Sequence, residues 1–295
     1  MNKEFEASLK SVETENVVDL YFYRPIGFQI ARALRNTHIT PNMITVLSIF
    51  VGVGTGVLFY FDSLILSLTG ILLLVFANIL DCVDGQLARL TGVKSEIGRI
   101  LDGVAGDIWF LTIYVCLALR LTNTYHTAWF FLPAFIAGMS HLLQANITDY
   151  YKTVHLYFVS QEKGGEFHNL EQVRCKQKTV KNGLQKVFLF LYEGYTGLQE
   201  NMTPALQALM KNLRTKYGDG VPENIRLDFR RKSCKLMKCC IDFLTFNGRT
   251  FVLFVVVLTD YIWIYFIYEA VILNIILFNG IRMHERMCRK INEKI

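Results

Sequence analysis

The sequence predicts an all-α fold: a polytopic membrane helix bundle of about six transmembrane helices with an N-terminal amphipathic surface helix. Composition is the first observation behind this prediction. Of the 295 residues, 52% are hydrophobic and 19% are charged, against about 25% charged in an average soluble domain. The second observation is that the hydrophobic residues gather in runs, since residues 43–61 and 63–80 contain no charged residue. A membrane span needs about 20 apolar residues, so these runs indicate transmembrane helices.

Six spans are expected from the hydrophobic runs. They cover residues 43–61, 63–80, 100–120, 127–147, 241–258 and 261–280. The third and the fifth are less apolar than the others, because Asp102, Asp107 and Arg120 fall in the third. Asp242 and Arg249 fall in the fifth.

The segment before the first span is expected to form an amphipathic helix on the membrane surface. Ile26, Ile30 and Leu34 recur every four residues, while Arg32 and Arg35 point away from them. This spacing is typical of a helix with one apolar face. The sequence 40–42, Thr-Pro-Asn, then ends that helix and begins the first span, with proline near the first helical position.

Basic residues predict the orientation in the membrane. Residues 1–42 contain five Lys and Arg, residues 81–99 three, residues 148–240 sixteen and residues 281–295 five. The opposite loops near residues 62 and 259 have none, and Arg120 stands at the edge of the third such loop. Basic loops face the cytosol, so both termini, residues 148–240 and a site at residues 81–99 are predicted to be cytosolic.

The expected organisation has five parts. They are a cytosolic N-terminal segment (1–42), four spans (43–147), a cytosolic insertion (148–240), two spans (241–281) and a basic cytosolic tail (282–295). The net charge of +6 is explained by this topology and by attraction to anionic membrane lipid. No compact basic motif of a nucleic-acid fold is present, so no nucleic-acid partner is expected.

The chemistry is expected where the second span ends and the third begins. At about 100° per residue, Asp84 lies 300° from Asp81, and Gly85 and Ala88 lie at 40° and 340°, so these four residues share one helix face. On the next helix, Asp102 lies between Gly98 and Gly106 in the same way. Small residues let two membrane helices approach closely. Three carboxylates brought together on such helices would bind a hard divalent cation, Mg²⁺ or Mn²⁺, which would recruit a phosphate-bearing substrate.

The spacing of these residues carries a family resemblance. The string D-x₂-D-G-x₂-A-R-x₈-G-x₃-D, which begins at Asp81 and ends at Asp102, resembles the signature of the CDP-alcohol phosphotransferase (phosphatidyltransferase) membrane enzymes. Seven positions match, and at about one in twenty per position a chance match is on the order of 10⁻⁹. The resemblance extends to the six-span layout and the segment before the first span, and it implies a homodimer.

The resemblance implies a reaction and a role for each matched residue. An acceptor hydroxyl would attack the lipid-linked phosphate of a CDP-activated lipid, with CMP as the leaving group. Asp81, Asp84 and Asp102 would hold the metal ions. CDP-diacylglycerol is the expected donor, and a small polyol or amino alcohol is the expected acceptor, with inositol or inositol phosphate as the first choice.

Three further residues would bind the nucleotide. Gly85 would allow the cytidine nucleotide to approach closely, and Ala88 would keep that helix face small. Arg89 would contact phosphate. Gly98 would serve helix packing.

One position departs from the family pattern. The signature ends with an aspartate four residues after Asp102, the proposed base for the acceptor hydroxyl, and that position is Gly106 here. Asp107 follows, and on a regular helix it would point about 140° away from Asp102. A π-type turn, made easy by Gly103 and Gly106, would realign it. Asp107 is therefore predicted to join the metal ligands and to serve, with Asp102, in catalysis, and the alternatives are a different base or a weakened enzyme.

Other functions and other residues stay open at this stage. A transporter would also use intramembrane carboxylates, and a family member that has lost activity could serve as a membrane scaffold. Basic side chains near the cytosolic face could bind an acceptor phosphate, namely Lys94, Arg99, Lys152, Arg282 and Arg286. His141 and Asn146 are expected to form a packed polar pair or to line the cleft. Asp260 and Glu269 are expected near the opposite interface, with the bundle interior as the alternative for Glu269.

Overall fold

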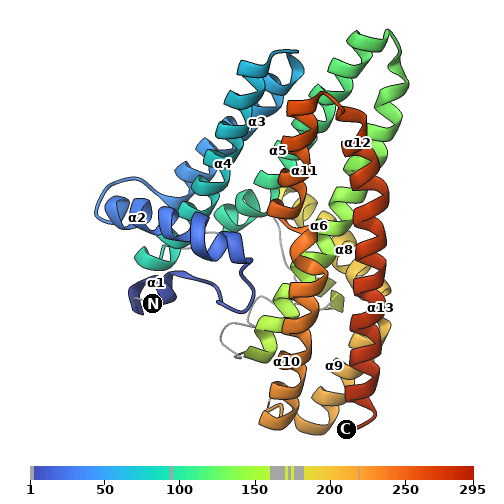
Figure 1. Ribbon diagram of the computed structural model, residues 1–295. Coiled ribbons are helices and arrows are strands. Elements are labelled where there is room, and N and C mark those ends of the chain that lie inside the picture. Colours follow the sequence, from blue (N-terminus) through green and yellow to red (C-terminus); the bar gives the residue numbers. More distant parts are fainter. Residues whose placement is uncertain (1–2, 94–95, 160–169, 172–173, 176–182, 219) are drawn as a thin grey trace. The chain divides into compact units, whose positions relative to one another are not determined.

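Every secondary-structure element that the structure describes is a helix. The computed structural model describes residues 3–93, 96–159, 170–171, 174–175, 183–218 and 220–295 (Figure 1). The chain forms two compact units, one made of Met1–Leu142 and Phe246–Leu273, the other of Leu143–Thr245 and Asn274–Ile295. The all-α fold class predicted from the sequence is confirmed.

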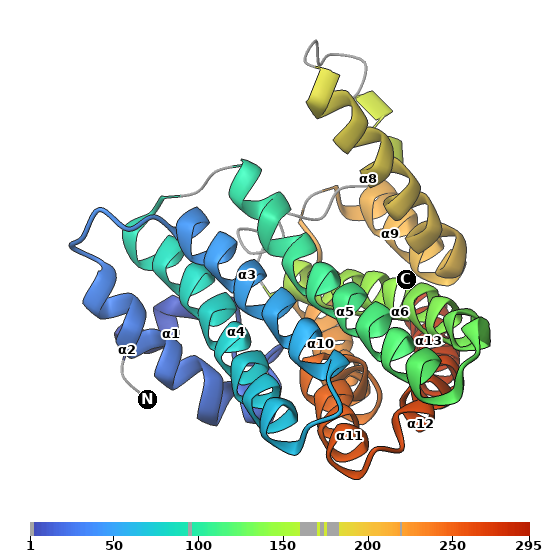
Figure 2. The ribbon, with the colours of Figure 1, turned by 90° about the horizontal axis from the view of Figure 1, so that it is seen from above.

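The first unit is built around three long helices. They are α3 (Pro41–Tyr60), α4 (Leu64–Thr91) and α5 (Glu96–Tyr125). Figure 2 shows α3 lying between α4 and α5. The unit also contains the start of α6 (Phe131–Val159), which follows the short 3₁₀ turn η2 (Ala128–Phe130). It is completed by α11 (Phe246–Thr259), α12 (Ile262–Ile267) and the π-helical turn η4 (Tyr268–Ile272).

The ends of α3 and α4 follow from local sequence. The Thr40 side chain accepts a hydrogen bond from the Met43 amide at 3.4 Å, and Pro41 is the first helical residue. This confirms the helix start predicted from Thr-Pro-Asn. α4 ends at Gly92, which adopts a left-handed conformation with φ of 72°, a backbone region that glycine enters at no steric cost.

Among the described residues, five helical segments are long and apolar enough to cross a membrane. They are Pro41–Tyr60, Leu64–Thr91, Leu101–Tyr125, Ala128–Val159 and Ile262–Asn292. The predicted span over residues 241–258 differs, because the α-helix there covers only Phe246–Thr259. Its 14 residues extend about 21 Å, less than the roughly 30 Å of a bilayer core. The extended backbone of Thr245 separates it from the 3₁₀ turn η3 (Ile241–Leu244).

Close packing of α3 against α5 depends on two glycines four residues apart. A Cβ atom at Gly52 would lie 2.1 Å from the Trp109 ring, and one at Gly56 would lie 3.0 Å from the backbone nitrogen of Ile113. Glycines at this spacing let membrane helices approach each other closely. Trp109 and Ile113 belong to the main hydrophobic core of the unit, with Phe59, Leu74 and Tyr265.

One buried arginine forms ion pairs near the far end of α5, its C-terminal end. Arg120 is 5% exposed and donates to Asp62 at 2.6 Å and to Asp260 at 2.7 Å. Asp62 lies in the α3–α4 connection and Asp260 in the α11–α12 connection. The α3–α4 connection, the α11–α12 connection and the C-terminal part of α5 therefore meet at one end of the unit.

The N-terminal segment packs along α4. It contains α1 (Lys3–Ser8), the π-helical turn η1 (Asp19–Tyr23) and α2 (Arg24–Leu34), and the ribbon runs beside the end of α4 in both views (Figures 1 and 2). Gly27 lets α2 come close, since a Cβ there would lie 2.6 Å from Gln86. Ile30 and Leu34 pack on the core, whereas Tyr21, Phe22 and Ile26 stay exposed. The predicted amphipathic helix is therefore present.

The second unit is held by contacts between the ends of its helices. Its elements are the later part of α6, α8 (Gly183–Met202), α9 (Pro204–Tyr217), α10 (Glu223–Cys239), η3 and most of α13 (Leu273–Asn292). Phe158 stacks on Phe229 at 3.8 Å between ring centroids. The Glu285 carboxylate accepts from the backbone amides of Ala205 and Leu206, which stabilises the N-terminus of α9.

Candidate metal centre

Three of the predicted metal ligands lie together in the first unit. Asp81 and Asp84 stand near the end of α4, and Asp102 stands in the second turn of α5. One carboxylate oxygen from each lies within 4.8 Å of the other two. Asp84 is buried, Asp81 is half-buried and Asp102 is exposed, so the group is open on one side.

The arrangement of Asp84 fits a divalent cation. Its Oδ2 accepts a hydrogen bond from the Thr45 hydroxyl at 2.6 Å. Its Oδ1 is buried and has no hydrogen-bond partner among the described residues, although buried polar atoms are nearly always paired. A cation bound between the three carboxylates would satisfy this oxygen, and oxygen ligands suit Mg²⁺ or Mn²⁺.

A charged arginine stands beside the carboxylate group. Arg24, at the start of α2, is 3.1 Å from Glu15. Burial acts to lower the pKa of the Arg24 guanidinium, but neighbouring acidic groups, Glu15 and Asp81 among them, outweigh this and raise the pKa above its ordinary value. The guanidinium is therefore protonated at neutral pH, and it offsets part of the negative charge on Asp81.

The predicted nucleotide-binding residues lie on the same helix as Asp81 and Asp84. Arg89 folds back over Gly85, because a Cβ at Gly85 would lie 3.1 Å from its terminal nitrogen. The Nε of Arg89 donates to the backbone carbonyl of Ser8 at 2.5 Å. Ala88 is half-buried on the next turn. The glycine thus leaves room for a guanidinium that is held in place from the N-terminal segment.

The start of α5 is open. A Cβ atom added at Gly103 or Gly106 would meet no atom of the described residues within 4 Å. Asp102 and Val104 are exposed. This part of the helix therefore has room for a bound molecule. Lys94 and the side chain of Arg99, which were candidates for phosphate binding, lie outside the described part of the structure.

Asp107 does not follow the predicted geometry. α5 is a continuous α-helix from Glu96 to Tyr125, so the π-type turn expected between Asp102 and Asp107 is not formed. Glycine permits such a turn but does not require it, and the regular hydrogen-bond ladder is kept. Asp107 stands outside the group of three carboxylates. Its Oδ1 lies 3.6 Å from Nε2 of His141, and its side chain is 32% exposed.

A buried polar network continues from His141. Arg249 on α11 donates to Nδ1 of His141 at 3.0 Å and to Glu269 at 2.5 Å. The Tyr114 hydroxyl lies 3.1 Å from the same histidine nitrogen. The sequence did not predict this network, because its members come from α5, α6, α11 and η4. Its one sequence signal is the presence of Arg249 and Glu269 in apolar runs, where charges are costly.

The contacts of Glu269, His141 and Asn146 bear on two of the sequence predictions. Glu269 is fully buried and paired with Arg249, which matches the alternative placement inside the bundle. His141 and Asn146 have separate partners, since the Asn146 side-chain amide donates to the backbone carbonyl of Tyr195 and its backbone carbonyl accepts from Gln199. The predicted polar pair is therefore not formed.

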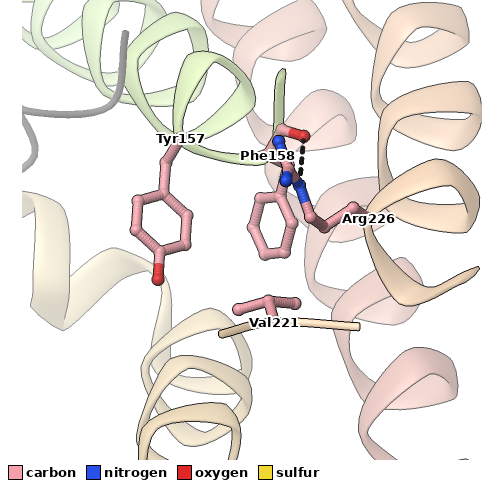
Figure 3. A pocket seen from close by; sticks show the side chains of 4 residues that line it. All are labelled: Tyr157, Phe158, Val221 and Arg226. Carbon is pink, nitrogen blue, oxygen red and sulfur yellow. Dashed lines mark hydrogen bonds between the residues drawn. The ribbon is translucent and has the colours of Figure 1, made fainter. Parts of the chain in front are cut away.

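A pocket in the second unit offers no comparable site. It is lined by Tyr157, Phe158, Val221 and Arg226, and Arg226 donates to the Phe158 carbonyl at 3.2 Å across it (Figure 3). Its volume is about 10 Å³, which is the lower limit for one water molecule. Arg226 also donates to the Val159 carbonyl, so its contacts fix the end of α6.

Comparison with known proteins defines the family. A family model described as CDP-alcohol phosphatidyltransferase matches residues 38–198, more than half of the chain. The chain therefore belongs to the CDP-alcohol phosphatidyltransferase family. The matched region contains α3, α4, α5 and all three clustered carboxylates. Membership in a membrane-enzyme family and five apolar helices together indicate an integral membrane protein.

Individual relatives match a smaller region. The chain is 39% identical over 74 residues to an archaetidylinositol phosphate synthase from Pyrococcus horikoshii, which is 25% of this chain and 38% of that protein. It is 41% identical over 66 residues to an uncharacterized protein from Aquifex aeolicus, or 22% of this chain and 32% of that protein. The matches thus span about a third of the length of each relative.

Proposed function

We propose that this protein transfers a phosphatidyl group from a CDP-activated lipid, with CDP-diacylglycerol as the first candidate, to the hydroxyl of a small alcohol, and releases CMP. One observation carries the proposal. Asp81, Asp84 and Asp102 converge within 4.8 Å at the spacing of the family signature, and the buried Oδ1 of Asp84 has no partner in the described structure. This is the donor set that a metal-dependent phosphoryl-transfer site needs.

The metal ion would be Mg²⁺ or Mn²⁺, held by Asp81, Asp84 and Asp102. When bound, it would neutralise the charge that develops on the transferring phosphate and its leaving group. The residues of α4 would position the donor. Gly85 admits the nucleotide to the helix surface, Ala88 keeps the next turn small, and Arg89 binds phosphate with its remaining guanidinium donors.

The acceptor hydroxyl must lose a proton as it attacks. Asp107 is the proposed base, and on the regular helix α5 it points about 140° away from Asp102, the metal ligand nearest to it in sequence. The open space at Gly103 and Gly106 leaves room for the acceptor between them. A carboxylate base of this kind contributes about 10²- to 10⁴-fold to the rate.

The acceptor is proposed to be inositol or inositol phosphate, followed by other small polyols and amino alcohols. Support comes from the partial match to an archaetidylinositol phosphate synthase. A homodimer in the membrane is proposed from the family resemblance.

The site, both termini and residues 148–240 are proposed to face the cytosol. Cys175 and Cys239 are exposed and lie in that segment. A membrane-impermeant thiol reagent should label them in inverted vesicles and not in intact cells. The reverse labelling would overturn the proposed orientation.

A second function is favoured by one observation. The family position for the final aspartate is Gly106, so the chain could be a family member without activity that serves as a membrane scaffold. Metal binding without catalysis would support it.

The deciding experiment is CMP release by the purified protein. CDP-diacylglycerol and Mg²⁺ or Mn²⁺ are supplied with one acceptor in each reaction, and Asp84→Ala serves as the control. We expect release with one acceptor, and no release from the Asp84→Ala protein. Absence of CMP with every acceptor, from folded protein that binds Mn²⁺, would favour the scaffold.

A further inference from the structure

We infer that His141 is a positioning residue for Asp107: its Nε2–H holds Oδ1 of that carboxylate, so that Oδ2 is presented to the acceptor hydroxyl. This inference rests on the proposed function. It assigns a purpose to the buried network of His141, Arg249 and Glu269.

The network begins with an ion pair inside the first unit. The Arg249 side chain is 2% exposed and that of Glu269 is 0% exposed. A buried charge is costly unless it is paired and hydrogen-bonded, and the 2.5 Å contact between them meets that need. Glu269 thus fixes where the Arg249 guanidinium can lie.

The backbone around Glu269 is also unusual. Residues Tyr268–Ile272 form a π-helical turn. Such turns are rare and occur frequently at functional sites. This turn lies within the apolar segment Ile262–Asn292, where a regular helix would otherwise be expected. It changes the direction in which the following side chains point.

The ion pair determines which nitrogen of His141 carries the hydrogen. A guanidinium can donate but cannot accept a hydrogen bond, so Nδ1 of His141, 3.0 Å from Arg249, must be the acceptor. A neutral imidazole with an acceptor at Nδ1 carries its hydrogen on Nε2. The Tyr114 hydroxyl also lies 3.1 Å from Nδ1, but this nitrogen has a single lone pair, so the Arg249 contact alone determines the tautomer.

Nε2 of His141 faces Asp107. The distance to Oδ1 is 3.6 Å, longer than a formed hydrogen bond. Catalytic hydrogen bonds are often long without substrate and tighten when it binds. His141 is buried while Asp107 is 32% exposed, so one carboxylate links the buried network to the open face of α5.

The contact between His141 and Asp107 has a chemical purpose, because Asp107 lies one residue beyond the position of the final aspartate in the family signature. On the regular helix its side chain is free to adopt rotamers that point away from the acceptor. A hydrogen bond to Oδ1 would select the rotamer that leaves Oδ2 toward the open space near Gly106. Oδ2 takes the hydroxyl proton while the acceptor oxygen bonds to the lipid-linked phosphorus. The bond from that phosphorus to the bridging oxygen breaks, CMP leaves with the electron pair, and Asp107 later releases the proton to water.

Two substitutions of nearly equal size separate this role from a packing role. In His141→Gln, the amide carbonyl can accept from Arg249 and the amide N–H can reach Asp107. In His141→Asn, the shorter side chain can accept from Arg249 but cannot reach Asp107. We expect kcat for CMP release to stay within about 3-fold of the native value in the first and to fall about 10- to 100-fold in the second. KM for CDP-diacylglycerol and the affinity for Mn²⁺ should be unchanged in both.

A double variant supplies the readout that a structural role would not give. If His141 acts through Asp107, His141→Asn should cause no further loss of kcat in an Asp107→Asn background, because the two residues form one unit. Independent, multiplicative losses would overturn the inference, as would equal losses from the Gln and Asn variants. Failure of the native protein to release CMP with any acceptor would instead overturn the proposed function, since all variants are compared with that rate.

Discussion

The two ends of α5 use charge in opposite ways. At the far end, Arg120 stands between Asp62 and Asp260, so opposite charges neutralise each other. At the near end, the N-terminal end of α5, Asp102 faces Asp81 and Asp84 of α4. One carboxylate oxygen of each residue lies within 4.8 Å of the other two, so three groups of like charge stand together. Two carboxylates at that separation repel each other by about 3 kcal/mol at an effective dielectric constant of 20. The first arrangement is neutralised by its own residues, whereas the second is one whose repulsion a bound cation would relieve.

The largest effect is expected from replacing one of the three clustered carboxylates, Asp81, Asp84 and Asp102. Asp84→Asn should abolish Mn²⁺ binding and lower CMP release at least about 10³-fold, because several kcal/mol of metal-dependent stabilisation of the transition state is lost. Titration with Mn²⁺ and a CMP assay measure both. In the absence of metal, the melting temperature of the Asp84→Asn protein should be equal to or above that of the native protein, since repulsion between the carboxylates is relieved. Asp62→Asn, at the far end, is the matched control and should leave binding and rate unchanged.

The next effect tests where the base must stand on α5. Asp107→Gly should lower kcat about 10²- to 10⁴-fold. Adding Gly106→Asp restores the family spacing, and the new side chain has room because a Cβ there meets no atom within 4 Å in the part of the chain that the structure describes. We expect the double variant to regain at least a tenth of the native rate.

Gly103→Asp in the same Asp107→Gly background is the control. It also adds a carboxylate at an open position of α5, on the same face as Asp107 but one helical turn, about 6 Å, before it, and at that distance it should not restore the rate. Recovery from both positions would show that any nearby carboxylate suffices. Recovery from neither would remove Asp107 from the role of base.

A smaller effect is expected at Thr45, whose hydroxyl contacts the Asp84 carboxylate. Thr45→Val removes the hydroxyl that donates to Asp84 Oδ2 at 2.6 Å and should weaken Mn²⁺ binding about 10- to 100-fold. Thr45→Ser keeps the hydroxyl and should bind Mn²⁺ as the native protein does. Equal affinities in the Val and Ser variants would contradict a role for Thr45 in orienting the carboxylate.

The smallest effect on function is expected at the far end. Arg120→Gln should lower the free energy of unfolding by about 1.5–3 kcal/mol, the value of hydrogen bonds to charged groups, without changing kcat or Mn²⁺ affinity. Asp62→Asn should cost less than about 1 kcal/mol, because its side chain is 77% exposed and exposed ion pairs contribute little. Chemical denaturation compares the two. A change in Mn²⁺ affinity would mean that the two ends of α5 are coupled.

Residues close together in the sequence were predictable, and contacts between distant helices were not. The grouping of Asp81, Asp84 and Asp102 followed from helical periodicity and from a spacing that spans one loop. The start of α3 at Thr40 and Pro41 followed from local capping chemistry. Periodicity gives the face of a helix but not its partner. The approach of Gly52 to Trp109 and the meeting of His141 with Arg249 and Glu269 therefore required the fold.

The π-helical turn shows the same limit. It was expected near Asp107, because Gly103 and Gly106 would permit it. π-Helical turns occur instead at Asp19–Tyr23 and at Tyr268–Ile272, and neither contains a glycine. Within the second turn Glu269 pairs with Arg249, a tertiary contact that no local signal in the sequence indicates.

The bond between Arg89 and the carbonyl of Ser8 has a consequence for the entropy of binding. A free arginine side chain carries about 2 kcal/mol of rotamer entropy, and immobilising such a side chain at an interface costs about 0.5–1.5 kcal/mol. Here the guanidinium is already fixed by α1 before any phosphate arrives, so that loss occurs on folding. A ligand that contacts Arg89 can therefore bind up to about tenfold more tightly, because the backbone carbonyl of Ser8 has already ordered the arginine side chain.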